Sequence, residues 1–287
     1  MKRILVVSGS RADYGLLEWP IKKLEEDGEF EVIATRIWDC DFAKAFDYAR
    51  LHLDGTDLLL LLGDRYEILA VAIAAHLQRI PIAHIGGGDV TEGSYDDAMR
   101  DCISRMASIH FVTSTSAMAR LSHAGFRNIH LVGNPGIDFI RHAQWRGERP
   151  IAEPYVVVSY QAETIDKGTL QDFDNIRACC VDSQTKRHVF IMPNPDRGNE
   201  TIRQHIEHHM AMYPDHHKVY EFLPHAEYLN LIAHCDELIG NSSSMLYEAP
   251  ELGVKTRMIG KRQKGRTIPW GDGHASERIV KILRYTA

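Results

Sequence analysis

The alternation of short apolar runs with stretches of helical periodicity is the feature of this chain that most constrains its fold. In the first half, apolar runs of strand length occupy residues 3–8, 31–37, 57–62, 82–85, 109–113 and 129–132. Helical patterns separate several of these runs, at residues 15–25, 68–77 and 95–108. This order predicts parallel β-α-β units whose helices cover both faces of one doubly wound sheet.

A second series of the same kind follows the polar, proline-bearing stretch of residues 142–154. Its expected strands are residues 155–160, 188–192, 218–222, 237–239 and 255–259. Its expected helices are residues 170–183, 200–212, 225–234 and 244–252. The 287 residues also exceed the roughly 100–150 at which single domains cluster. We therefore predict two α/β sheets joined by one linker, with ligands bound at loops that follow strands.

Composition excludes two classes of protein. With 33 Lys and Arg against 39 Asp and Glu, the formal charge is −6. The chain also lacks a basic tail, which excludes a general nucleic-acid-binding protein. The longest apolar run, residues 58–62, is far shorter than the roughly 18–20 residues of a membrane span. The first three residues lead directly into the apolar run of residues 4–7, which is typical of a first strand and not of a signal peptide. The five cysteines contain no Cys-x-x-Cys pair, which favours a reducing cytoplasm over a disulfide scaffold.

The 16 histidines raise the question of a metal site. His205 and His209 stand four residues apart in an expected helix, a spacing that can grip a metal ion. No carboxylate stands at the spacing of a His-Glu-x-x-His motif, so we favour a solvated polar face, followed by His216 and His217 in a loop. No metal site is predicted.

The loop of residues 8–15 follows the first expected strand and precedes a helix. Its small residues let backbone N–H groups approach an anion, and the guanidinium of Arg11 suits phosphate oxygens. The loop contains neither Gly-x-Gly-x-x-Gly nor a Walker motif, so an ordinary tight turn is the alternative.

A second candidate anion site runs from Asn241 through Ser242, Ser243 and Ser244, after an expected strand and at the start of a helix. Hydroxyls and free N–H groups in that position suit a diphosphate, and Glu248, about one turn further on, suits ribose hydroxyls. The alternative is that one serine simply caps the helix.

A basic loop follows near the end of the chain, where residues 260–266 include Lys261, Arg262, Lys264 and Arg266. A loop of this composition is usually a solvated surface, but beside a polyanionic ligand it acts as a clamp.

Charged residues also follow two expected strands of the first half. Asp64 and Arg65 end one strand, and Asp89 follows three glycines after the next. Consecutive glycines indicate a close backbone approach or left-handed dihedrals. Carboxylates of Asp64, Asp89 and Asp96 in one cleft would raise one another's pKa, which suits general acid–base catalysis. The alternative for Asp64 and Arg65 is a surface salt bridge.

Structural roles compete for the same segment. Ser94 and Asp97 resemble a capping box, and Asp96 and Arg100 have the spacing of an ion pair on a helix. Both the structural and the catalytic interpretation stay open at this point.

Together, these segments resemble the UDP-N-acetylglucosamine 2-epimerase family, in particular its hydrolysing, sialic-acid-pathway branch. The Gly-Asn-Ser-Ser-Ser block of residues 240–244 and the Arg-Gln-Lys-Gly-Arg block of residues 262–266 are the most specific matches. The matching stretches, in family order across nearly the whole chain, are residues 9–15, 63–65, 84–100, 110–111, 132–138, 193–196, 239–244 and 259–266.

The resemblance implies a glycosyltransferase-B-type fold, in which two Rossmann-like domains enclose a central cleft for a sugar nucleotide. The N-terminal domain would comprise residues 1–148 together with a C-terminal helix, residues 275–287, that crosses back to it. The nucleotide-binding domain would comprise residues 149–274. A homodimer is expected from the resemblance alone.

By the same resemblance, Arg11, Ser242 and Ser243 hold the diphosphate and Glu248 holds the ribose. The expected catalytic residues are Asp64, Asp89, Asp96 and Arg100. Further substrate-binding candidates are Asp13, Asn194, Asn241, Arg262 and Arg266. The family reaction removes the C2 proton of UDP-N-acetylglucosamine and expels UDP to give a glycal, to which water adds, releasing N-acetylmannosamine. This chemistry requires no metal or redox cofactor.

Departures from the family pattern leave the activity open. Gly86 stands where many members carry Glu and some His, and Gln161 stands where His is usual. An amide cannot shuttle a proton at neutral pH as imidazole can, although Glu163 is near enough in sequence to substitute. The segment between Trp38 and Thr56 is also shorter than the family's. The alternatives are an epimerase-like or glycosyltransferase-like enzyme of another sugar nucleotide, and a sugar-nucleotide-binding protein with attenuated catalysis.

Overall fold

The computed structural model describes the chain except residues 39, 164–168, 181–185, 194–197 and 287. The chain forms two compact units. The first unit contains Met1–Val90, Asp96–Ala143 and Thr267–Ala287, and the second contains Thr91–Tyr95 and Gln144–Arg266.

This division differs from the sequence-based boundaries at three places, because residues 91–95 and 144–148 belong to the second unit and residues 267–274 to the first. The side chain of Asn230 holds the second of these segments, through hydrogen bonds of 3.0 Å with the N–H of Gly147 and the carbonyl of Glu148. Backbone hydrogen bonds explain the other two differences. In the first unit, the N–H groups of Thr267 and Trp270 donate to the carbonyls of Val90 and Thr113, each at 2.8 Å. In the second unit, the N–H group of Gly93 donates to the carbonyl of Lys264 at 3.2 Å.

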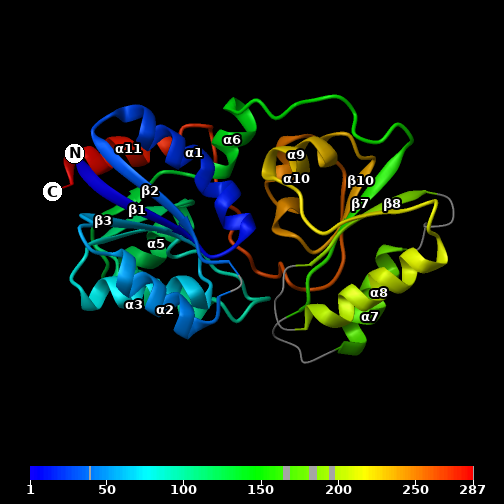
Figure 1. Cartoon of the computed structure of the whole chain (residues 1–287), viewed down its shortest axis with the longest axis horizontal. Coiled ribbons are helices and arrows are strands. Elements are labelled where there is room, and N and C mark those ends of the chain that lie inside the picture. The colour runs from blue at the N-terminus through cyan, green and yellow to red at the C-terminus, as the bar shows by residue number, and fades with distance from the viewer. Residues whose placement is uncertain (39, 164–168, 181–185, 194–197, 287) are drawn as a thin grey trace. The chain divides into compact units, whose positions relative to one another are not determined.

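The first unit contains a sheet of six parallel strands in the order β2-β1-β3-β4-β5-β6 (Figure 1). The strands are β1 (Lys2–Ser8), β2 (Phe30–Arg36), β3 (Leu58–Leu62), β4 (Ile82–Ile85), β5 (Ile109–Val112) and β6 (Ile129–Leu131). Each coincides with an apolar run that the sequence singled out. The strand order reverses between β1 and β3, which is the switch point where ligands of such sheets bind.

Helices cover both faces of this sheet. They are α1 (Arg11–Asp27), α2 (Phe42–His52), α3 (Tyr66–Leu77), α4 (Asp97–Met106), α5 (Thr115–His123), α6 (Pro135–His142) and α11 (Ala275–Tyr285). Because side chains alternate along a strand, Ile4 and Val6 of β1 pack with α1 and α11, whereas Leu5 and Val7 pack with α2 and α3. The doubly wound arrangement predicted from the sequence is confirmed.

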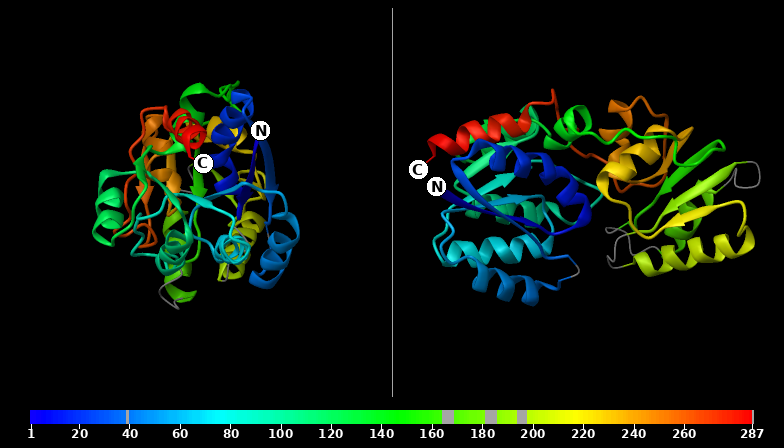
Figure 2. Two further views of the ribbon diagram at one scale, coloured as in Figure 1. Left: turned by 90° about the vertical axis from the view of Figure 1, so that its left-hand side faces the viewer. Right: turned by 45° about the horizontal axis from the view of Figure 1, so that its top comes forward.

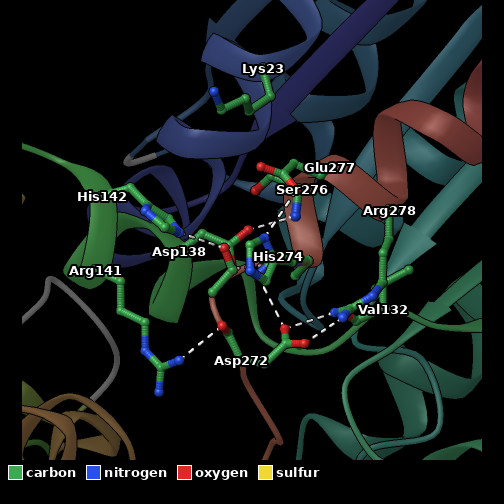
Figure 3. Close-up of polar contacts among 12 residues, drawn as sticks. Lys23, Val132, Asp138, Arg141, His142, Asp272, His274, Ser276, Glu277 and Arg278 are labelled. Atoms are coloured by element: carbon green, nitrogen blue, oxygen red, sulfur yellow. Dashed lines mark hydrogen bonds and ion pairs between the residues drawn. The ribbon is translucent and has the colours of Figure 1, made fainter.

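The last helix, α11, lies beside α1 (Figure 1 and Figure 2). Ile279 and Leu283 of α11 share the apolar cluster that contains Leu17 and Leu24 of α1. At the start of α11, the carboxylate of Asp138 accepts hydrogen bonds from backbone N–H groups, within a polar network that joins α6 to α11 (Figure 3).

The second unit contains a sheet of five parallel strands in the order β11-β10-β7-β8-β9. Its elements are β7 (Tyr155–Ser159), α7 (Thr169–Cys179), β8 (Arg187–Ile191), α8 (Asn199–Met212), β9 (Lys218–Tyr220), α9 (His225–Ala233), β10 (Glu237–Gly240), the 3₁₀ turn η1 (Ser243–Met245), α10 (Glu248–Glu251) and β11 (Thr256–Met258). Val156 and Val158 of β7 pack with Ile202 and Ile206 of α8. The switch point of this sheet lies between β7 and β10.

Helix boundaries differ from the sequence-based ones in three respects. The expected helix 244–252 is wrong, because Tyr247 adopts φ −138° and separates η1 from α10. Helix α1 begins at Arg11 rather than at residue 15, because the side chain of Ser10 caps it by accepting from the N–H of Asp13. Helices α2, α5 and α6 were not predicted from the sequence. Across the part of the chain that the structure describes, no helix combines the length and apolar character needed to cross a lipid bilayer.

Candidate active site

The switch point of each sheet carries several of the residues that the sequence singled out. In the first unit, the turns after β1 and β3 carry Arg11, Asp13 and Asp64. In the second unit, the turns after β7 and β10 carry Gln161 and the serine-rich segment that begins at Asn241.

The first turn of α1, directly after β1, holds a partly buried carboxyl group. Asp13 accepts a hydrogen bond of 2.8 Å from the hydroxyl of Ser10. Burial raises the pKa of Asp13 to about 7, although the Ser10 hydroxyl and the charge of Arg65 partly oppose the shift. Asp13 therefore titrates near neutral pH, a property that suits proton transfer.

Arg11 is the first residue of α1 and is exposed. Its guanidinium lies 6.0 Å from the centre of the Trp38 ring, and Arg36 lies 4.0 Å from the ring of Tyr14. Two cations thus stand over aromatic rings beside the N-terminus of a 17-residue helix. This arrangement presents positive charge where the sequence predicted an anion site.

Arg100 of α4 organises the acidic residues of the first unit. Its buried guanidinium pairs with the carboxylates of Asp64 and Asp97 and donates to the carbonyl of Asp89 at 2.7 Å. Burial alone lowers the pKa of Arg100, but the facing carboxylates raise it above its ordinary value. The cation is therefore permanent, and it holds Asp64, which follows β3, against α4.

Asp64 and Arg65 each pair with a residue other than the sequence neighbour that was one alternative for them. Asp64 pairs with Arg100, whereas Arg65 donates to the buried carboxylate of Glu67 at 2.9 Å. The capping-box interpretation of Ser94 and Asp97 is wrong, because α4 begins at Asp97 with Asp96 at the N-cap. Asp96 is partly exposed at the start of this helix.

Asp89 is held by a residue that the sequence analysis missed. The hydroxyl of Thr113, directly after β5, donates to both carboxylate oxygens of Asp89, at 2.9 and 3.0 Å. Gly86 has φ +86°, and a Cβ atom at that position would lie 3.8 Å from Oδ2 of Asp89. The carboxylate of Asp89 therefore lies next to the point where a side chain at position 86 would begin.

His84 supports the same region from the core. Its Nε2 donates to the carbonyl of Gly63 at 2.8 Å, and its Nδ1 lies 3.1 Å from the hydroxyl of Ser104. Burial lowers the pKa of His84 to about 4, so the ring is neutral and accepts from Ser104. The imidazole thereby fixes the carbonyl of the residue before Asp64.

In the second unit, Asn241 connects the turns after β7 and β10. Its Oδ1 accepts from the N–H of Gln161 at 2.7 Å, and its Nδ2 donates to the carbonyl of Gln161 at 2.8 Å. The residue is fully buried, so its amide positions the two turns. The side chain of Gln161 in turn lies 3.4 Å from Nδ2 of Asn199.

The serine-rich segment is a short 3₁₀ turn. Ser242 caps it, accepting from the N–H of Ser244 at 3.3 Å and donating to the hydroxyl of Ser244 at 3.1 Å. Ser243 lies 3.2 Å from the hydroxyl of Tyr247. The capping role proposed as the alternative is thus present. Because η1 and α10 are both short, anion binding here depends on hydroxyl and N–H groups and not on a long helix dipole.

Glu248 begins α10 and is buried. Its Oε1 accepts a hydrogen bond of 2.8 Å from Nε2 of His225, the first residue of α9. His225 fixes the orientation of this carboxylate. The sequence contains no periodic or spacing signal that links residues 225 and 248.

The basic loop of residues 260–266 is tied to the same turns. Arg262 donates to the carbonyl of Ala162 at 2.6 Å, and Gln263 donates to the carbonyl of Asn241 at 2.7 Å. Arg266 lies 3.3 Å from Oε1 of Gln263. The carboxylate of Glu163 accepts from the N–H of Lys261, so it is engaged within the second unit.

Asn194 lies outside the described residues, so its predicted role stays a prediction. The expectation of a solvated His217 is wrong. His217 is buried, not solvated, and its ring stacks on that of His209 at 5.0 Å. Among the residues that the structure describes, no group of three or more His, Cys, Asp or Glu side chains is arranged to hold a metal ion.

Comparison with known proteins identifies the family. A profile of the UDP-N-acetylglucosamine 2-epimerase family matches residues 49–268. The chain belongs to the UDP-N-acetylglucosamine 2-epimerase family. It is 29% identical to the polysialic acid biosynthesis protein P7 of Escherichia coli, over 93% of this chain and 80% of that protein. It is 26% identical to the UDP-N,N'-diacetylbacillosamine 2-epimerase (hydrolyzing) of Legionella pneumophila, over 93% of this chain and 83% of that protein.

Solved structures of the epimerase family share the fold. The S. aureus MnaA–UDP complex matches with a TM-score of 0.80 at 17% identity, covering 99% of this chain and 96% of that chain. The Methanocaldococcus jannaschii UDP-GlcNAc 2-epimerase, solved with UDP-GlcNAc and UDP, matches with a TM-score of 0.80 at 17% identity over 100% of both chains. The fold class is therefore the glycosyltransferase-B type, as the resemblance implied.

The epimerase-family profile covers Arg100, its acidic partners and the serine-rich segment, but it begins after Arg11 and Asp13 and ends before α11. Arg11 and Asp13 follow β1, and Asp64 follows β3. Because β1 pairs with β3, the structure places the residues outside the matched range beside Asp64, which lies within it.

Proposed function

We propose that this protein is a UDP-N-acetylglucosamine 2-epimerase of the hydrolysing type, acting on UDP-N-acetylglucosamine or a closely related UDP-sugar. The observation that carries the proposal is the buried Arg100, which holds Asp64 and Asp97 by their carboxylates and Asp89 by its carbonyl at the carboxyl end of the first sheet. Family membership supports the substrate class, and the hydrolysing relatives support the outcome.

In this proposal, the first unit supplies the chemistry. A carboxylate among Asp64, Asp89 and Asp96 removes the proton from C2 of the sugar while the C1–O bond breaks, leaving a C1=C2 double bond, and the bonding electrons depart with UDP. Water then adds, its oxygen to C1, while a proton returns to the opposite face of C2. The balance is UDP-N-acetylglucosamine plus water giving N-acetylmannosamine plus UDP.

Asp13 is a candidate for the protonated partner in this scheme. Its partly buried carboxyl group, with a pKa of about 7, exists in both protonation states near neutral pH. A group of this kind can supply a proton at one step and recover it at another. The cation of Arg100 pairs with the carboxylate of Asp64.

In this proposal, the remaining candidate residues bind the nucleotide part of the substrate. Arg11, Ser242 and Ser243 bind the diphosphate, and Glu248, oriented by His225, accepts hydrogen bonds from the ribose. Further substrate-binding candidates are Asn194, Asn241, Arg262 and Arg266. No metal or redox cofactor enters the scheme.

The test is incubation of the full chain with UDP-N-acetylglucosamine in D₂O, followed by proton and phosphorus NMR. We expect released UDP and N-acetylmannosamine carrying deuterium at C2, because the returning proton comes from solvent. UDP release with no deuterium at C2 contradicts the elimination step. Absence of both UDP and any epimer contradicts the proposed activity altogether.

A binding protein with attenuated catalysis is the second candidate, and Gln161 is the observation that favours it. Its amide cannot transfer a proton, and its backbone is pinned by Asn241. On this view the chain binds UDP but turns over slowly, and Gln161→His raises the turnover number by at least tenfold. An epimerase that uses Asp13 and Asp89 instead gains little from the same substitution. An enzyme acting on another sugar nucleotide is distinguished by a panel of substrates.

We place the activity in the cytoplasm, in a homodimer, in pathways to sialic acid or related acidic sugars. The five cysteines support the compartment, since all are free thiols. The E. coli relative named for polysialic acid biosynthesis supports the pathway. Sedimentation equilibrium tests the dimer.

A further inference from the structure

The hydroxyl of Tyr228 is buried beside the serine-rich segment, close to the hydroxyls of Ser242 and Ser244, but no hydrogen bond of ordinary geometry joins it to a described residue. Buried polar groups are hydrogen-bonded in the great majority of native proteins, and each exception calls for an explanation. A buried hydroxyl without a partner lowers the free energy of unfolding, so its presence is consistent with a role in function.

The surroundings of this hydroxyl point to the nucleotide half-site of the second unit. It faces the side chains of Ser242, Ser244, Tyr247 and Glu248. Tyr228 lies three residues after His225 on α9, so the two side chains share one face of that helix. His225 orients Glu248, and Tyr228 faces the serines beside it.

In the present arrangement, the oxygen of Ser244 already accepts from Ser242, and the phenol of Tyr228 makes no hydrogen bond of ordinary geometry with either serine. The hydroxyl of Ser242 donates to that of Ser244 at 3.1 Å, so the proton of Ser242 is used within the segment. A ligand oxygen that accepts from Ser242 requires this proton to turn outward. Ser244 can then donate back to Ser242, and its own oxygen becomes the natural acceptor for the phenol.

We propose that Tyr228 is a positioning residue for nucleotide binding, whose hydroxyl donates to Ser244 when Ser242 turns its proton to an oxygen of a bound nucleoside diphosphate. The chain of donors then runs from Tyr228 through Ser244 and Ser242 to the ligand. Burial raises the pKa of Tyr228, so the phenol remains a donor across the physiological range. The inference rests on the proposed function, since the ligand is the diphosphate of the UDP-sugar.

The test compares UDP affinity and stability in the full-length chain. Tyr228→Phe removes the hydroxyl alone, and we expect UDP to bind about 3–10-fold more weakly, the effect of one net hydrogen bond. The melting temperature without ligand should stay unchanged or rise, because the hydroxyl has no partner to lose. A purely structural role predicts the opposite pattern, with lower stability and unchanged affinity.

Tyr155→Phe is the matched control in the same unit. The hydroxyl of Tyr155 is buried and donates to the carbonyl of Leu231 at 2.6 Å, away from the serine-rich segment. We expect this variant to melt at a lower temperature with unchanged UDP affinity. Isothermal titration calorimetry with UDP and thermal unfolding of each variant give both readouts.

Ser244→Ala, alone and combined with Tyr228→Phe, completes the comparison. The donor chain predicts that Tyr228→Phe has little further effect on UDP affinity once Ser244 has lost its hydroxyl. Equal UDP affinity of the wild type and Tyr228→Phe, or full additivity of the two substitutions, overturns the inference while the proposed function stands. If the wild type itself does not bind UDP, the result contradicts both the positioning role of Tyr228 and the proposed function.

Discussion

The carboxylate of Asp138 accepts a hydrogen bond of 2.6 Å from the backbone N–H of Ser276 and a second, of 3.1 Å, from that of Ala275 (Figure 3). Both partners begin α11, where the N–H groups have no acceptor within the helix. Asp138 is fully buried on α6, so its charge also faces the positive end of the helix dipole. One side chain thereby anchors the last helix to the first unit.

Asp138→Ala should lower the free energy of unfolding by about 2–4 kcal/mol, because it leaves two buried N–H groups without an acceptor. Urea denaturation followed by circular dichroism measures the change. Asp101→Ala, at an exposed position of α4, serves as the control and should change stability by less than about 0.5 kcal/mol. Equal stability of the two variants contradicts the anchoring role.

Arg100→Lys should abolish most of the activity, with kcat at least 100-fold lower. A lysine ammonium lacks the planar fork that contacts Asp64, Asp97 and the carbonyl of Asp89 together. The measurement is UDP release under saturating substrate. Arg105→Lys, in the same helix but exposed, is the matched control and should keep wild-type kcat. A fully active Arg100→Lys would remove the basis of the proposed mechanism.

Asp13→Asn should stabilise the protein at high pH and impair it as an enzyme. The pKa of Asp13 is raised to about 7 in the folded state, so its stabilising contribution is present below pH 4 and is lost as the pH rises through 7. The amide carries no charge, so the variant should melt at a higher temperature than wild type at pH 8 and show little difference at pH 4. The pH dependence of kcat for this variant should no longer show the change near pH 7 that the titration of Asp13 produces in the wild type. A variant with an unchanged profile would show that Asp13 does not transfer protons.

Acid should destabilise the second unit between pH 6.5 and 4, whereas in the first unit the raised pKa of Asp13 opposes the loss from His84. Burial lowers the pKa of His84 and of His217 to about 4, so each is neutral when folded and takes up a proton more readily when unfolded. Their contribution is present above pH 6.5 and is lost as the pH falls through 4, at up to about 1.4 kcal/mol per pH unit for each group. Thermal unfolding across this range should show the loss.

His217→Phe isolates one of these groups. It keeps an aromatic ring against His209 and removes the titration, so the stability of this variant should fall less steeply below pH 6.5. His208→Phe, at an exposed position of α8, should leave the slope unchanged. Because His217→Phe also removes the acceptor for the N–H of His188, the slopes are compared and not the absolute stabilities.

The strands were predictable because their signal is local. Five consecutive leucines at residues 58–62 are apolar on both faces, which only a central parallel strand requires. Helix ends were less predictable, since they depend on single contacts. Ser10 extends α1 toward its N-terminus by accepting from Asp13, and Tyr247 ends η1 through its backbone conformation.

The members of the candidate site were largely predictable, but their partners were not. Asp64 and Arg100 each stand in a recognisable block, yet 36 residues separate them, and only the pairing of β3 with β4 and the packing of α4 bring them together. Thr113 and His225 carry no motif at all. Their roles follow from the sheet order, which places the ends of distant strands at one edge.

The first unit is closed by Thr267–Ala287, the last stretch of the chain, although it also contains the first strand. During translation, all strands of the second unit emerge from the ribosome before Ile279 and Leu283 of α11. The apolar cluster that these two residues share with α1 is incomplete until then. The unit that is synthesised first is therefore the one that finishes folding last.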